Sequence, residues 1–98
     1  MSRLVAIVGP TASGKSQLAL RLAQDFNGEI INADSRQIYR YMNIGTAKPD
    51  NSEFALVPHH LIDIINPDED FGLAQYQELA NRAIAGIRRC GKLPLLVG

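Results

Sequence analysis

The segment Gly9–Ser16, GPTASGKS, has the spacing G-x-x-x-x-G-K-[ST] that is typical of loops that hold phosphate groups. Glycines in such a loop adopt backbone geometry that other residues resist, so that successive N–H groups can surround an anion. Lys15 adds a positive charge, and the Ser16 hydroxyl is a candidate ligand for Mg²⁺ beside the phosphates. We therefore predict a phosphate site that comprises Gly9, Pro10, Thr11, Ala12, Ser13, Gly14, Lys15 and Ser16.

A carboxylate follows the next apolar stretch of the chain. Residues 29–34, EIINAD, have the pattern of a strand that ends at Asp34. In an open parallel sheet, ligands gather beyond the carboxyl ends of the strands, which is where this side chain would lie. The residues alone leave two roles open for Asp34: a proton acceptor beside a ligand, or a cap of the following turn together with Ser35.

The last apolar stretch narrows the class of reaction. A nucleoside triphosphatase with a phosphate loop usually has an apolar strand that ends in an Mg²⁺-organising aspartate. The candidate strand LPLLV, residues 93–97, is followed by Gly98 instead. The pattern therefore points away from motors and switches, and it leaves open a kinase or a reaction in which phosphate is the leaving group.

These residues require strands that alternate with helices to position them. Residues 4–8 form a short apolar run, as expected for a strand that is covered on both faces. The following helix is predicted to end at Asn27-Gly28, and its apolar face consists of Leu18, Ala19, Leu22, Ala23 and Phe26. A second helix is predicted from Leu73 to a stop at Gly91, with an apolar face of Leu73, Tyr76, Ala80, Ala83, Ile84 and Ile87.

The remaining segments complete the predicted fold. Residues 59–65, HHLIDII, are predicted to be a third strand, and residues 93–97 a fourth. Residues 35–58 are predicted to be mostly irregular, with a helical turn near Gln37. Strands that alternate with helices predict an α/β domain, which here would be a P-loop-like parallel sheet flanked by helices. Because the chain stops on an apparent interior strand, we expect residues 1–98 to be the N-terminal, incomplete part of such a domain.

Composition sets further limits. An apolar fraction of 46% in 98 residues is typical of a globular domain, and no apolar run is long enough to span a membrane. Ten basic and ten acidic residues cancel, so charge alone gives no support to a nucleic-acid partner. The single cysteine, Cys90, excludes an internal disulfide and fits a reducing compartment. We expect the protein to be cytoplasmic.

His59 and His60 are the obvious candidates for metal binding. Adjacent residues of a strand point to opposite faces of the sheet, so this pair cannot easily hold one ion, and no Cys or His cluster accompanies it. We therefore interpret both histidines as structural. Tyr39 and Tyr41 have rings that can stack on a base, but partial burial at the sheet edge is the simpler interpretation.

Three longer motifs are more specific than the loop: ADSRQIYRYMNIGTAKP, VPHHLIDI and GPTASGKS at their mutual spacing. Together, from Leu4 to Gly98, they resemble the N-terminal part of the tRNA dimethylallyltransferases, also called tRNA isopentenyltransferases. The sequence departs from that pattern in small ways. Asn32 stands where the family often has serine, and Tyr41 and Asn43 stand where glycine and aspartate are common.

The resemblance implies transfer of a dimethylallyl group from dimethylallyl diphosphate to the exocyclic amine of the adenine that lies 3′ of the anticodon in tRNA. It implies that the loop holds the departing diphosphate with Mg²⁺, and that Asp34 is the general base. Ser35, Arg36 and Gln37, with Asp34, match the family segment that contacts tRNA. Thr46 and Lys48 would lie near the substrate channel, although Lys48 fits an exposed lysine equally well. Base flipping of the target adenine is also implied.

Alternatives remain at this stage. An isopentenyltransferase that acts on free adenine nucleotides shares the loop and the acid, and a small-molecule kinase shares the loop. ATP is retained as a second ligand, because any such loop is expected to bind a nucleotide. The 98 residues alone are expected to be catalytically incomplete, since the rest of the core and a tRNA-binding insertion would lie beyond Gly98.

Overall fold

The computed structural model describes residues 4–9, 14–34, 38–40 and 51–98. Strand β1 (Val5–Ile7) is followed by helix α1 (Lys15–Asp25) and strand β2 (Gly28–Asn32). Helix α3 (Asn51–Leu56) and the short strand β3 (His59–His60) come next, and helix α4 (Leu73–Arg89) leads into strand β4 (Leu93–Val97). The predicted alternation of strands and helices is confirmed.

The four strands form one parallel sheet with the order β1-β4-β2-β3. Strand β4, the last strand in the sequence, lies between β1 and β2, with Leu95 opposite both Val5 and Ile30. Parallel pairing requires a crossover for each connection, and the helices supply it. Because every strand runs in the same direction, the carboxyl ends of all four strands lie at one edge of the sheet.

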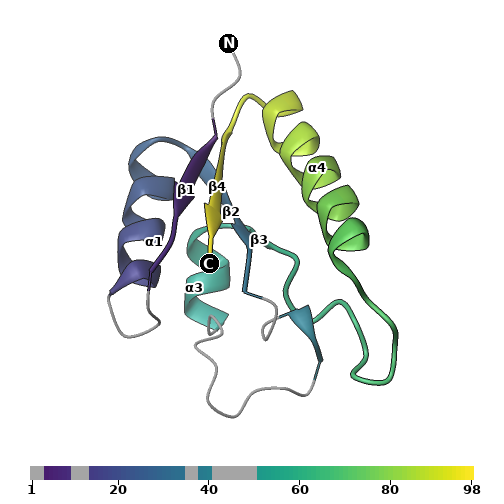
Figure 1. Cartoon of the computed structure of the whole chain (residues 1–98). Coiled ribbons are helices and arrows are strands. Elements are labelled where there is room, and N and C mark those ends of the chain that lie inside the picture. The colour runs from purple at the N-terminus through teal and green to yellow at the C-terminus, as the bar shows by residue number, and fades with distance from the viewer. Residues whose placement is uncertain (1–3, 10–13, 35–37, 41–50) are drawn as a thin grey trace.

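Helices cover the sheet on both faces, with α1 on one side and α4 on the other (Figure 1). Successive side chains of β2 point to opposite faces, yet Ile30 and Ile31 are both buried, which requires a cover on each side. On the α1 face, small residues permit close packing of the helix on the strands. That core consists of Ala19, Ala23, Ile30, Val57 and Leu95.

The helix ends follow from local sequence. Gly14, with φ of 77°, precedes α1, and the Leu18 N–H donates to the Gly14 carbonyl at 3.1 Å. Helix α4 begins after Gly72, whose N–H donates to the Gln75 side chain. It ends at Arg89, and Gly91 follows with a φ of 74°, which glycine favours, and with its N–H donating back to the Arg88 carbonyl at 2.9 Å.

Several details differ from the sequence-based expectation. Helix α3 occupies part of a segment that was predicted to be irregular, and the third strand is two residues long rather than seven. Leu18 and Phe26 were placed on the buried face of α1, but they are 51% and 63% exposed. Leu73 of α4 is exposed as well. Alanines at the centre of the α1 face bring the helix close to the sheet, which leaves larger side chains at its margin.

Candidate functional site

The glycine loop begins directly after β1, at the carboxyl edge of the sheet. Lys15 Nζ, from the first turn of α1, donates to the carbonyl oxygen of Gly9 at 2.9 Å. This contact holds the ammonium group over the loop, beside the positive end of the helix dipole. The first turn of α1 carries no acidic side chain that would offset this charge. The described part of the loop therefore has the electrostatics of an anion site.

Asp34 lies at the same edge, two residues beyond the end of β2, and it is partly buried. Its backbone is held from both sides by the side chain of Asn32. Asn32 Oδ1 accepts from the Asp34 N–H at 2.9 Å, while Asn32 Nδ2 donates to the Asp34 carbonyl at 2.8 Å. The chain segment that carries the carboxylate is thus fixed to the end of the strand.

The ends of β4 and β2 approach each other closely beside Asp34. The Ala33 N–H donates to the Val97 carbonyl at 2.8 Å, and the Gly98 N–H donates to the Ile7 carbonyl at 3.0 Å. A Cβ at Gly98 would lie 2.7 Å from Ala33 Cβ, a distance that real Cβ atoms essentially never show. Glycine is therefore required at residue 98 for the sheet edge to close in this way.

The distance between the glycine loop and Asp34 follows from the strand order. The glycine loop follows β1 and Asp34 follows β2, with β4 between them. Neighbouring strands are about 4.8 Å apart, so the two strand ends are separated by roughly 10 Å. That span suits a reaction in which an anionic group is held at one end and a proton is removed at the other.

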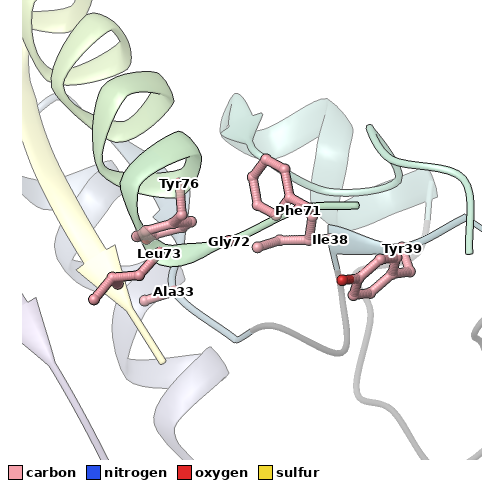
Figure 2. Close-up of a pocket in the computed structure, with 7 residues that line it drawn as sticks. All are labelled: Ala33, Ile38, Tyr39, Phe71, Gly72, Leu73 and Tyr76. Atoms are coloured by element: carbon pink, nitrogen blue, oxygen red, sulfur yellow. The ribbon is translucent and has the colours of Figure 1, made fainter. Parts of the chain in front are cut away.

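A cavity of about 250 Å³ adjoins the Asp34 segment (Figure 2). It lies between the segment after β2 and the start of α4, and most of its walls are apolar or aromatic. Its lining consists of Ala33, Ile38, Tyr39, Phe71, Gly72, Leu73 and Tyr76. Aromatic walls of this kind can accept a flat apolar group or a base.

Tyr76 joins this cavity to the strand end. Its hydroxyl donates to the Asn32 carbonyl at 2.9 Å. Burial raises the pKa of the Tyr76 phenol, so this group stays a donor at neutral pH. Neither Asn32 nor Tyr76 was predicted as a site residue. The sequence feature that points to Asn32 is its place as a polar residue at the end of the apolar segment EIIN. A polar side chain there needs hydrogen-bond partners if it is buried.

The two histidines have structural partners, as predicted. His59 Nδ1 lies 2.7 Å from the Val57 carbonyl. His60 Nε2 lies 2.7 Å from Glu29 Oε1, and Lys92 Nζ lies 3.4 Å from Glu29 Oε2. Burial raises the pKa of the Glu29 carboxyl, but the hydrogen bonds from His60 and Lys92 and the charges of those two groups together outweigh burial, so its pKa lies below the ordinary value. Cys90 is exposed at the end of α4.

Other predicted site residues lie outside the described part of the chain. They are Pro10, Thr11, Ala12 and Ser13 of the loop, Ser35, Arg36 and Gln37 after Asp34, and Tyr41, Thr46 and Lys48. Their predicted roles stay predictions, and so does that of the Ser16 hydroxyl. The structure brings Gly9, Gly14, Lys15 and Asp34 to one edge of the sheet.

The side chains near the loop are compatible with an Mg²⁺ ion that also binds substrate phosphates. Among the residues that the structure describes, no group of three His, Cys, Asp or Glu side chains could hold a metal ion. Mg²⁺ commonly binds through one or two protein oxygens together with substrate phosphates and water, so a single hydroxyl at the loop is compatible with it.

None of the helices in the described ranges is long and apolar enough to cross a membrane.

Two family models match the chain. One, described as "Isopentenyl transferase", matches residues 2–65, and the other, described as "IPP transferase", matches residues 37–98.

Individual proteins match the chain over its whole length. The chain is 65% identical over 98 residues to a tRNA dimethylallyltransferase of Roseiflexus castenholzii, of which it covers 32%. It is 52% identical to a tRNA isopentenylpyrophosphate transferase from Bacillus halodurans of known structure, with a TM-score of 0.93 over 100% of this chain and 33% of that one. A eukaryotic dimethylallyltransferase solved acting on tRNA gives a TM-score of 0.93 at 39% identity, over 100% of this chain and 24% of that one. The chain spans about a third of the length of the curated relatives that it matches.

Proposed function

This chain belongs to the isopentenyl (IPP) transferase family, and from that premise we propose that the protein containing it is a tRNA dimethylallyltransferase. It transfers a dimethylallyl group from dimethylallyl diphosphate to the exocyclic amine of the adenine 3′ of the anticodon. One observation carries the proposal: an anion-binding loop and a carboxylate lie two strands apart at one edge of the sheet. Residues 1–98 are the N-terminal part of the P-loop core, and the rest of the core and a tRNA-binding insertion follow in the longer protein.

The loop binds the diphosphate that departs. Breaking the allylic carbon–oxygen bond leaves an electron pair, and therefore negative charge, on the diphosphate. The Lys15 ammonium, the loop N–H groups and the amino end of α1 stabilise this charge as it develops, which lowers the barrier to transfer. The Ser16 hydroxyl would be the protein ligand of an Mg²⁺ ion, which would supply further positive charge to the diphosphate. Pro10, Thr11, Ala12 and Ser13 complete the loop between Gly9 and Gly14.

Asp34 acts at the acceptor end. The adenine amine is a weak nucleophile because its lone pair is delocalised into the ring. As that lone pair forms the new nitrogen–carbon bond, the Asp34 carboxylate takes the amine proton. The neighbouring aromatic cavity supports entry of a flipped base from this side, with Ser35, Arg36 and Gln37 contacting the tRNA around it. Every charge is accounted for: a proton moves to Asp34, and diphosphate leaves.

The decisive assay combines the full-length enzyme, unmodified tRNA, labelled dimethylallyl diphosphate and Mg²⁺, with AMP and ATP as rival acceptors. We expect label in tRNA alone. Label in AMP or ATP would instead assign the protein to the isopentenyltransferases of free nucleotides. No transfer to any acceptor would favour a small-molecule kinase. We also expect the 98-residue chain alone to be inactive and the enzyme to work in the cytoplasm, where its tRNA substrate is found.

One substitution and one competition assay test the assigned roles. Asp34→Ala should abolish transfer while dimethylallyl diphosphate still binds, because the carboxylate acts only at the amine. An equal loss of diphosphate binding would refute the general-base role. ATP is a candidate second ligand of the loop, and its competition with dimethylallyl diphosphate in the same binding assay measures that directly.

A further inference from the structure

Among the residues that the structure describes, Asn32 is the polar side chain that the core buries, with 3% of its surface exposed. A buried amide is costly unless its hydrogen bonds are made. Asn32 uses both of its N–H donors, one on the Asp34 carbonyl at 2.8 Å and one on the Leu61 carbonyl at 2.9 Å. Its oxygen accepts from the Asp34 N–H. The side chain is therefore committed to the two loops that follow β2 and β3.

The far end of the loop after β3 is held by the N–H groups of Ile64 and Ile65, which donate to the Ile38 carbonyl. Its start, at Leu61, is held by Asn32. Leu61 and Asp63 both have positive φ, 65° and 56°, a conformation that costs energy for residues other than glycine. The strand before them, β3, contributes only two residues to the sheet. The bond from Asn32 to Leu61 ties this strained loop to β2, the neighbouring strand in the sheet order.

A third element fixes Asn32 itself. The Tyr76 hydroxyl of α4 donates to the Asn32 carbonyl at 2.9 Å. The backbone of Asn32 is thus held from the α4 side, while its side-chain amide holds the Asp34 segment. Displacement of Asn32 would break hydrogen bonds to three segments at once, so several bonds together fix the position of Asp34.

We propose that Asn32 is a positioning residue for the transfer reaction: its amide sets the place of the Asp34 carboxylate. The proposal rests on the general-base role proposed for Asp34. A carboxylate that removes a proton must lie within hydrogen-bond reach of it, and a misplacement of 1 Å can cost about 100-fold in rate. Asn32 does not touch the reacting atoms and acts through the backbone on both sides of Asp34.

Single-turnover transfer by the full-length enzyme separates positioning from folding. A structural defect lowers the amplitude, since fewer molecules are active, whereas a misplaced base lowers the rate constant. For Asn32→Ala we expect the rate constant to fall by roughly 10- to 100-fold, with the Kd for dimethylallyl diphosphate changed less than about twofold. The matched control is Asn81→Ala, an exposed asparagine of α4, which should leave the rate constant unchanged.

A double-mutant cycle then tests the route of the effect. In an Asp34→Asn background, Asn32→Ala should lower the residual rate by less than about threefold, because the group that it positions is already absent. The same loss in both backgrounds would overturn the proposal. If Asp34→Asn itself leaves the rate unchanged, the general-base role proposed for Asp34 fails, and that result is distinct from a failure of the Asn32 proposal.

Two milder variants serve if Asn32→Ala does not fold. Tyr76→Phe removes the hydroxyl that holds Asn32, and Asn32→Ser keeps an acceptor for the Asp34 N–H but cannot donate to both carbonyls. Each should lower the rate constant less than alanine at residue 32 would, at full amplitude. Wild-type rate constants in both variants would overturn the proposal.

Discussion

Gly98→Ala tests how far the segment that carries Asp34 can move before transfer fails. A Cβ at residue 98 would lie 2.7 Å from Ala33 Cβ and 3.1 Å from the carbonyl carbon and oxygen of Ala33. Ordinary contact begins at 3.4 Å, so the two Cβ atoms must separate by about 0.7 Å. All three atoms belong to Ala33 itself, two of them to its backbone, so no flexible side chain can absorb the shift. The displacement is passed to the next residue, Asp34.

The expected effect is larger on catalysis than on folding. Overpacking of this kind costs about 1–3 kcal/mol of stability. A shift approaching 1 Å at the base should lower the single-turnover rate constant by roughly 10- to 100-fold, while diphosphate binding changes little. The assay is transfer of labelled dimethylallyl to tRNA, with thermal unfolding measured in parallel.

Gly86→Ala is the matched control. Gly86 lies inside α4, and a Cβ there would meet nothing within 4 Å. We expect the same rate constant as in the wild type and a gain of up to about 1 kcal/mol in stability, since alanine favours helix. The reasoning is refuted if Gly98→Ala transfers within twofold of the wild-type rate with unchanged diphosphate affinity.

Three further predictions concern binding and stability. Lys15→Ala should raise the Kd for dimethylallyl diphosphate about 10- to 100-fold in calorimetric titration, because a charge-assisted contact is lost; an unchanged Kd would contradict the loop assignment. Leu95→Ala should cost about 2–5 kcal/mol in urea unfolding, since this side chain is fully buried, against almost nothing for the exposed Leu73→Ala. Because the folded-state pKa of Glu29 is lowered, its stabilising effect is present above the unfolded value near 4.5 and is lost as pH falls through the lower one. Thermal unfolding of Glu29→Gln should therefore depend less on pH in that range, and parallel curves for the two proteins would exclude this role.

The arrangement of strands and helices could be predicted because the chain alternates short apolar runs with amphipathic segments. Helix α3 could not, since its six residues are too few to display a helical period. The exposure of Leu18 and Phe26 depends on how closely α1 approaches the sheet, which is decided by tertiary packing on Ala19 and Ala23.

Some residues of the candidate site could likewise be predicted from the sequence, and others could not. Lys15 and Asp34 could be found because the loop pattern and the strand end are local. The role of Asn32 could not, because its amide bonds to Leu61, which is 29 residues away in the sequence. Sequence marks Asn32 only as a polar residue in an apolar strand. Its partners become visible once β2 and β3 are paired.

The central place of β4 also governs when the sheet can form on the ribosome. Val5 pairs with Leu95, about 90 residues later, and at 5–20 residues per second that partner is synthesised roughly 5–20 s after β1. Because β4 lies between β1 and β2 in the sheet, these two strands have no native pairing with each other in the meantime. A nascent chain that has not reached residue 93 therefore carries β1 without its native sheet partner. Slow translation across this interval would prolong the period in which that apolar segment is open to aggregation.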